Sequence, residues 1–170
     1  MSKLYIVTGP AGVGKSTISK GIADCENKSV LIEGDDIYHQ VVGGYVSPWK
    51  DGNHLELFWN VCISTIKIYL EAGYDVVFNY IISNKEFEKL KETFKEYEMR
   101  FIVLLVNKET IIDRDNLRPE DCRMKERCLI LLDNFINYNY NTDYIIYTDG
   151  MSILDTVAEV MSQERFIVKK

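Results

Sequence analysis

The chain has 170 residues, 46% of them hydrophobic, and a formal net charge of −6 at pH 7. This length predicts one domain with a single core, and the acidic balance argues against a nucleic-acid binder or a binder of anionic membranes, because both need a basic surface. No stretch approaches the roughly 20 apolar residues of a membrane span, and the first residues show no signal-peptide pattern, so we expect a cytoplasmic protein.

Short β-branched runs alternate with longer segments of helical periodicity, which is typical of a parallel sheet with helices on both faces. The predicted strands are residues 4–8, 30–33, 75–79, 100–106 and 144–147. Helices are predicted at 15–24, from 35, from an N-cap at Asn53 to Gly73, from an N-cap at Asn84 to 97, from 108 to 138 with a break at Pro119, and at 152–163. Residues 1–170 are therefore expected to form one domain.

Residues 9–16 read GPAGVGKS, a full match to the phosphate-loop pattern G-x-x-x-x-G-K-[ST], directly behind the first predicted strand. Backbone N–H groups of such a loop point at a triphosphate, and the following helix adds its positive N-terminal end. The lysine supplies charge for the β- and γ-phosphates, and the serine hydroxyl is a Mg²⁺ ligand. The predicted ATP site therefore includes Gly9, Ala11, Gly12, Val13, Gly14, Lys15 and Ser16. A glycine-rich turn without a ligand is the alternative.

Carboxylates gather where the second predicted strand ends, at Glu33, Asp35 and Asp36. Ligands of open α/β folds bind at this edge of the sheet. Asp35 is therefore predicted to orient an attacking hydroxyl and accept its proton, as phosphoryl transfer requires, whereas Asp36 is expected mainly to cap the next helix. Glu33 or Asp35 is also a candidate to hold Mg²⁺ through water. His39, one turn later, either faces the same cleft or is a surface histidine.

The third predicted strand ends in Asn79 and Tyr80, where a nucleotide hydrolase would place a metal-side carboxylate. Asparagine can hold a water or a substrate hydroxyl but adds no negative charge, which argues against a motor or a strong hydrolytic ATPase. The aromatic loop at residues 43–50 either contacts the substrate or closes the edge of the core. Acceptor specificity is expected to depend on loop geometry around Tyr38, Tyr45, Trp49 and Tyr80.

Basic residues concentrate between residues 108 and 130 of this acidic chain, at Arg114, Arg118, Arg123, Lys125 and Arg127. The first two and the second pair of arginines are each four residues apart, so each pair is predicted to share a helix face on its side of the proline break. We expect a helical lid that closes on ATP, excludes water and stabilises charge on the transferring phosphoryl group. The alternative is a solvated helix whose arginines are neutralised by neighbouring acidic residues.

The turn at Thr148 follows the last predicted strand, and it either contacts the adenine or is an ordinary connection. The stretch Asn107-Lys108-Glu109-Thr110 is similar to the start of a guanine-reading N-K-x-D motif. Thr110 lacks the carboxylate that would accept the guanine N–H groups. GTP specificity is therefore not expected.

The order of phosphate loop, Glu33-Gly34-Asp35, basic segment and Thr148 turn resembles the small P-loop kinases over essentially the whole chain. The gluconate kinase-like, AAA_33-type group is the most similar, with shikimate kinase and chloramphenicol phosphotransferase as more distant relatives. The resemblance implies an α/β P-loop NTPase fold, a five-stranded parallel sheet in the order 2-3-1-4-5, and a helical lid. It implies that Gly12, Gly14, Lys15, Ser16 and Thr17 hold ATP and Mg²⁺. The His-Pro that gluconate kinase has soon after its Gly-Asp element is absent here, where Gln40-Val41 follows His39, and this argues against gluconate itself.

These features predict an ATP-dependent, Mg²⁺-requiring kinase that phosphorylates a hydroxyl of a small polar metabolite, such as a gluconate-like sugar acid, a nucleoside or an antibiotic. The expected catalytic residues are Lys15, Asp35, Arg118 and Arg123, with Arg114, Arg118 and Thr148 completing the nucleotide site. The expected acceptor-side residues are Asp35, Tyr38, His39, Trp49, Asn79, Tyr80 and Arg123. An ATP-binding regulatory or interaction domain with little catalysis is the alternative, favoured by Asn79.

Overall fold

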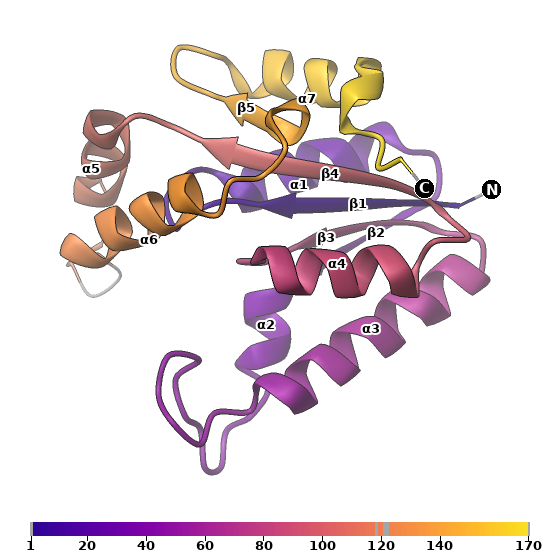
Figure 1. Cartoon of the computed structure of the whole chain (residues 1–170), viewed down its shortest axis with the longest axis horizontal. Coiled ribbons are helices and arrows are strands. Elements are labelled where there is room, and N and C mark those ends of the chain that lie inside the picture. The colour runs from indigo at the N-terminus through magenta and orange to yellow at the C-terminus, as the bar shows by residue number, and fades with distance from the viewer. Residues whose placement is uncertain (1, 118, 121–122, 170) are drawn as a thin grey trace.

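The computed structural model describes residues 2–117, 119–120 and 123–169 (Figure 1). Its strands are β1 (Lys3–Thr8), β2 (Ser29–Glu33), β3 (Asp75–Asn79), β4 (Glu98–Leu105) and β5 (Ile145–Tyr147). Its α-helices are α1 (Lys15–Cys25), α2 (Gly34–Tyr38), α3 (Leu55–Glu71), α4 (Asn84–Thr93), α5 (Lys108–Asn116), α6 (Glu126–Asn137) and α7 (Ile153–Ser162). The 3₁₀ turns Thr142–Tyr144 and Glu164–Phe166 flank the last strand and the last helix.

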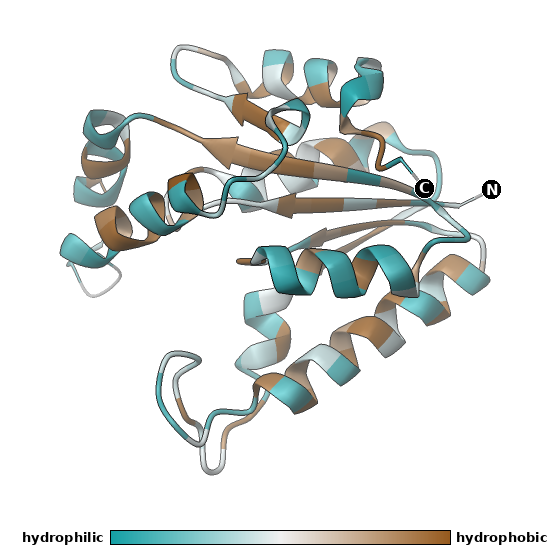
Figure 2. Ribbon diagram, in the orientation of Figure 1, coloured by the Kyte–Doolittle hydropathy of each residue, from teal (hydrophilic) through white to brown (hydrophobic). Residues whose placement is uncertain are grey.

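The five strands pair in parallel in the order β2-β3-β1-β4-β5, which confirms the predicted sheet and its topology. In Figure 1, α1 lies behind this sheet and α4 in front of it. The strands run brown through the centre of Figure 2, whereas α4 turns a largely teal face outwards. Leu4, Ile6 and Val7 of the central strand β1 are fully buried, because helices cover both faces of a parallel sheet.

Buried side chains attach the helices to the sheet. Trp59 of α3 packs edge-on against Phe78 of β3, with ring centroids 6.2 Å apart. Arg100 of β4 donates from Nη1 to the carbonyls of Val160, Met161 and Gln163, at 3.0, 3.3 and 3.1 Å. These carbonyls end α7 and have no partner within the helix. The arginine therefore fixes the last helix to the edge of the core.

The N-caps of two helices lie one residue away from the predicted caps. Asn53 accepts the backbone N–H of Leu55 at 3.1 Å, but α3 itself starts at Leu55 behind His54. Ser83, not Asn84, is the N-cap of α4, because Ser83 and Glu86 form a reciprocal capping box that satisfies two backbone donors.

The strands deliver their carboxyl ends to one side of the molecule, which is where the arrowheads of β1 and β4 point in Figure 1. The helices α5 and α6 lie on this side, and both chain termini lie on the other. The segment predicted as a lid at residues 108–130 contains α5 and the start of α6, which continues to Asn137. None of the helices in the described part of the chain is long and apolar enough to cross a membrane.

Candidate active site

A pocket of about 760 Å³ opens at the carboxyl ends of the strands. Its walls come from the phosphate loop (residues 9–16), α2, the loop before α3, α3, the segment after β3, α4 and the start and end of α6. Of the residues predicted to bind ATP, its lining includes Ala11, Gly12, Gly14, Lys15, Ser16 and Thr17. The first glycine of the loop and Val13 are buried outside it.

The phosphate loop is folded tightly against the neighbouring strand. Gly9 has a φ of +152°, and a Cβ at this position would lie 2.4 Å from the carbonyl oxygen of Leu104. Only glycine fits this conformation and this close approach. The Lys15 ammonium donates to the carbonyls of Gly9 and Pro10 at 3.0 and 3.2 Å, so it lies over the curl of the loop. The helix α1 begins at Lys15, directly after the loop, so its first backbone N–H groups have no partner within the helix and can donate to an anion there.

Glu33 connects the phosphate loop to the end of β3. Its Oε2 accepts a hydrogen bond from the Ser16 hydroxyl at 3.1 Å and another from Asn79 Nδ2 at 2.6 Å. The strand register pairs Glu33 with Asn79, and Asn79 is 2% exposed. A carboxylate therefore lies beside Asn79 and supplies the negative charge that the asparagine lacks.

The oxygen atoms around Ser16 fit a magnesium ion. Mg²⁺ takes oxygen ligands, keeps several waters and is usually held by one or two carboxylates together with substrate phosphates. The Ser16 hydroxyl and the Glu33 carboxylate, within hydrogen-bond distance of each other, supply such a set. Within residues 2–117, 119–120 and 123–169 no three His, Cys, Asp or Glu side chains cluster as a metal site. Phosphate and water oxygens would therefore complete the coordination.

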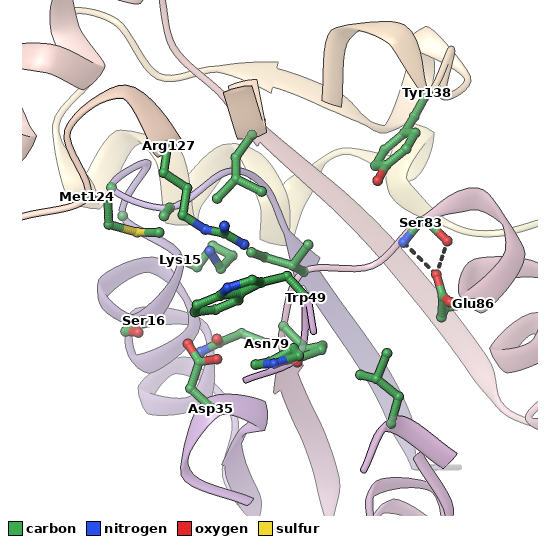
Figure 3. A pocket seen from close by; sticks show the side chains of 18 of the residues that line it. Lys15, Ser16, Asp35, Trp49, Asn79, Ser83, Glu86, Met124, Arg127 and Tyr138 are labelled. Atoms are coloured by element: carbon green, nitrogen blue, oxygen red, sulfur yellow. Dashed lines mark hydrogen bonds between the residues drawn. The ribbon is translucent and has the colours of Figure 1, made fainter. Parts of the chain in front are cut away.

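Asp35 reaches the pocket from the first turn of α2 (Figure 3). This helix begins at Gly34 with Glu33 at the N-cap position, so the expectation that Asp36 caps it is wrong. Gly34 is required because a Cβ there would lie 2.6 Å from Cδ2 of Tyr80. Burial raises the pKa of Tyr80, and the negative charge of Asp35 raises it further. Tyr80 therefore stays a neutral phenol beside the carboxylate.

Tyr38 and His39 do not line the pocket. Tyr38 is buried, and its hydroxyl donates to the carbonyl of Val46 at 2.7 Å. His39 Nδ1 lies 2.7 Å from the Asp35 carbonyl oxygen, and its ring stacks on Tyr45 with centroids 5.6 Å apart. Both residues hold the loop that follows α2, which includes Trp49.

The helices α5 and α6 are attached to the phosphate loop and to each other by partly buried polar contacts. Arg114 donates to the carbonyl of Val13 at 2.8 Å, which joins α5 to the back of the loop. The buried Asp115 carboxylate accepts the backbone N–H groups of Met124 and Lys125 at 3.0 and 2.8 Å, just before α6 begins. Arg114 thus contacts the nucleotide loop through its backbone.

Arg127 is the arginine of α6 that reaches the pocket. Its guanidinium lies 3.8 Å from the ring centroid of Trp49, and both line the cavity. Arg123 is exposed and lies outside the lining. Because α6 begins at Glu126, Arg123 precedes it, and the prediction that Arg123 and Arg127 share a helix face is wrong. Arg118 lies outside the described residues.

Thr148 is buried away from the pocket, and its N–H donates to the Leu105 carbonyl at 3.0 Å. The next residue, Asp149, accepts the Asn107 N–H and the Thr110 hydroxyl, the latter at 2.7 Å. Asn107 itself is the N-cap of α5. The stretch that is similar to a guanine-reading motif is therefore a helix start tied to the Thr148 turn.

Residues that the sequence did not single out also line the pocket. They are Leu55, Trp59, Ile81, Ser83, Glu86, Met124, Leu131 and Tyr138. Their common signal is position: most follow a strand or begin a helix on the carboxyl side of the sheet, which is the binding edge of such folds.

The comparisons with known proteins agree with this architecture. The model of the AAA_33 family, described as an AAA domain, matches residues 4–127. A search of curated proteins found no match. Among solved structures, a sugar kinase from a Janibacter species is 16% identical, with a TM-score of 0.72 over 98% of this chain and 96% of that one. A gluconokinase from Sinorhizobium meliloti is 19% identical, with a TM-score of 0.64 over 94% and 90%.

A chain of the Pnkp1/Rnl/Hen1 RNA repair complex is 21% identical, with a TM-score of 0.66 over 81% of this chain. The match spans 45% of that longer chain. At these identities the likeness shows the fold, which is that of the small, gluconate kinase-like P-loop kinases. Because the family model matches well over half of its length, the chain belongs to the AAA_33 family of AAA domains.

Proposed function

We propose that the protein is an ATP-dependent kinase that transfers the γ-phosphoryl group to a hydroxyl of a small molecule and uses Mg²⁺ as its cofactor. The observation that carries the proposal is that the phosphate loop with Ser16 borders the same pocket as Asp35 (Figure 3), while the Ser16 hydroxyl donates a hydrogen bond to the Glu33 carboxylate. A phosphate site, an oxygen-rich metal site and a base beside one another are the parts that phosphoryl transfer needs.

The residues divide the work by their chemistry. The phosphate loop and Lys15 would hold the β- and γ-phosphates, and Ser16 with Glu33 would hold a magnesium ion, which would supply positive charge to neutralise those phosphates. Asp35 accepts the proton of the acceptor hydroxyl as its oxygen bonds to the γ-phosphorus and the bond to the bridging oxygen of ADP breaks. Arg127 brings positive charge to the same cavity.

The α5–α6 segment would serve as the lid over the nucleotide. Arg114 connects it to the phosphate loop, and the buried Asp115 carboxylate connects its two helices. We assign the Thr148 turn to the adenine, because Asp149 holds that turn against the start of α5. Closure would exclude water from the transferring group.

The second candidate function, an ATP-binding module with little catalysis, was favoured by the missing carboxylate at Asn79. The position of Glu33 weakens it, because its carboxylate accepts a hydrogen bond from Asn79 and another from the metal-ligand serine. The two functions differ in one measurement: a kinase releases ADP in step with a phosphorylated acceptor, and a module binds ATP without doing so.

The test compares Asp35→Asn with Asp36→Asn, a matched change at the exposed neighbour that does not line the pocket. ADP release from Mg–ATP is measured with sugar acids, nucleosides and phenicols as acceptors, and ATP binding is measured by calorimetry. Asp35→Asn should slow transfer about 10²- to 10⁴-fold while ATP binding is retained. Lys15→Ala should slow it about 10²- to 10³-fold. Equal transfer rates in the two aspartate variants would remove Asp35 from the reaction.

A further inference from the structure

Aromatic rings line the pocket beyond the phosphate loop. Trp49, Trp59, Tyr80 and Tyr138 reach it from the loop before α3, from α3, from the end of β3 and from the end of α6. Trp59 and Tyr80 are only 9% and 8% exposed, and their rings pack edge to face with centroids 5.7 Å apart. They form a fixed apolar wall next to Asn79.

Trp49 is a second, open aromatic surface. It is 58% exposed although its indole lies against Arg127. In Figure 3 the indole lies between Asp35 and Asn79 on one side and Lys15 and Arg127 on the other. An indole that is open to solvent in a cavity can stack on a planar ligand. Such stacking is favourable because the open face of the indole and the facing surface of the ligand then leave water.

The charges of the pocket do not suit an anionic acceptor. Of the described lining residues, Lys15 and Arg127 are the positively charged ones. Lys15 belongs to the phosphate loop, and Arg127 lies on the Trp49 ring. Asp35 and Glu86 add negative charge. Outside the phosphate loop the described lining therefore holds two carboxylates against one cation, which favours a neutral acceptor over the carboxylate of a sugar acid.

The pocket also has a polar end opposite Asp35, formed by Ser83, Glu86 and Tyr138 (Figure 3). Glu86 Oε2 is engaged by Ser83, whose N–H donates to it at 3.0 Å. The same carboxylate has a second oxygen that can accept an N–H or O–H of a ligand. One cavity thus combines a base, an aromatic middle and an acceptor of hydrogen bonds.

From this arrangement we propose that the phosphoryl acceptor is a neutral compound in which a planar aromatic ring is joined to a hydroxyl-bearing part. The proposal rests on the proposed kinase function and names its substrate class. The hydroxyl lies at Asp35, the ring lies between Trp49 and the wall of Trp59 and Tyr80, and a donor group on the ring side meets Glu86. A nucleoside and an aromatic antibiotic of the phenicol type both have this chemistry, whereas gluconate does not. The cavity volume of about 760 Å³ lies within the range of pockets for drug-sized ligands.

Binding can be measured without turnover. The chain contains two tryptophans, Trp49 and Trp59, and both line the pocket, so all tryptophan emission reports on it. Uridine, adenosine, chloramphenicol and D-gluconate are titrated into the protein without ATP and with a non-hydrolysable ATP analogue. A nucleoside or the phenicol should change the emission and bind at least about tenfold more tightly than gluconate in calorimetry. Gluconate binding as tightly as every ring compound, or no ring compound binding at all, would overturn the proposal.

Variants locate the effect. Trp49→Ala should lower the affinity for the ring compound about tenfold in calorimetry, because stacking on one aromatic side chain is lost. Trp49→Phe should restore most of the affinity. Tyr147→Ala, which removes an exposed ring of β5 outside the pocket, serves as the control and should change nothing. Equal affinities of wild type and Trp49→Ala for each ring compound would show that the ring does not stack on Trp49.

The outcome is separable from that of the kinase assay. If a ring compound binds but is not phosphorylated, the proposed kinase function is wrong, and the proposed class of compound is a ligand of the pocket without being a phosphoryl acceptor. If gluconate is phosphorylated and no ring compound binds, the kinase function stands and the acceptor class is wrong. A comparison of the affinities for uridine and adenosine with the affinity for chloramphenicol decides whether the ring compound is a nucleoside or a phenicol.

Discussion

Glu33 allows a test that separates its charge from its hydrogen bonds. Its Oε2 accepts the only hydrogen bond that the Asn79 amide nitrogen donates within the described residues, and it also accepts the Ser16 hydroxyl. Glu33→Ala removes both the charge and the acceptor. Glu33→Gln removes the charge alone, because an amide oxygen at the position of Oε2 can still accept from both Asn79 and Ser16.

The magnitudes follow from this geometry. Asn79 is buried, so an unpaired amide in Glu33→Ala should cost about 1–3 kcal/mol of the free energy of unfolding. In a domain of this size that lowers Tm by about 2–4 °C for each kcal/mol. Glu33→Gln should cost less than about 1 kcal/mol, because the hydrogen bonds are retained. Both variants lose the charge that faces the metal, and a charge-assisted interaction of about 1.5–3 kcal/mol corresponds to a roughly 10- to 100-fold weaker apparent affinity for Mg²⁺.

The assay is thermal unfolding of wild type and variants with ATP, titrated with MgCl₂, since ligand binding to the folded state raises Tm. Glu56→Gln is the matched control, because this exposed glutamate in the first turn of α3 does not line the pocket. If Glu33→Gln keeps the wild-type response to Mg²⁺, Glu33 has no part in metal binding. If Glu33→Ala is as stable as wild type, the bond to Asn79 contributes nothing.

Three other contacts give predictions. Gly34→Ala places a Cβ 2.6 Å from the Tyr80 ring and should lower the free energy of unfolding, measured by urea denaturation, by about 1–3 kcal/mol. An unchanged free energy of unfolding would mean that the Tyr80 ring can move aside without an energetic cost. Burial would raise the pKa of Glu26, but hydrogen bonds from Tyr5 and a neighbouring lysine lower it overall. Wild type should therefore have a higher free energy of unfolding than Glu26→Gln, with the full difference above pH of about 4.3, the ordinary carboxyl pKa, and a smaller one as the pH falls below it. A difference in unfolding free energy that does not change with pH would contradict this. Asp115→Ala should leave two backbone N–H groups unpaired and speed hydrogen exchange at the start of α6, with the exchange of β1 amides as reference.

The fold could be predicted because its signals are local. The apolar run of β1 is buried on both faces, so its composition alone indicates a central parallel strand. The phosphate loop is equally local, since the conformation of Gly9 and the position of Lys15 depend on one turn. Pro119 predicted the break between α5 and α6, because proline cannot continue the hydrogen-bond pattern of a helix.

The walls of the site depend on contacts between distant segments, which periodicity does not report. Trp49 meets Arg127 because the loop before α3 and the start of α6 reach the same cavity. Tyr38 and His39 looked like site residues because they follow Asp35, yet the turn of α2 directs them to the loop instead. Spacing along a helix could not distinguish Arg123 from Arg127 until the first residue of α6 was known.

The asparagine at the end of β3 shows why one strand cannot be interpreted without its neighbours. In a parallel sheet, residues in register on adjacent strands lie side by side, and their side chains leave the same face. Glu33 and Asn79 are such a pair. A carboxylate at the end of β2 therefore reaches the space that a carboxylate at the end of β3 would fill, and the amide of Asn79 holds it in place. The charge that a metal needs depends on the pair, so the lack of an acidic residue at the carboxyl end of β3 does not argue against phosphoryl transfer when β2 supplies one within 3.1 Å of Ser16.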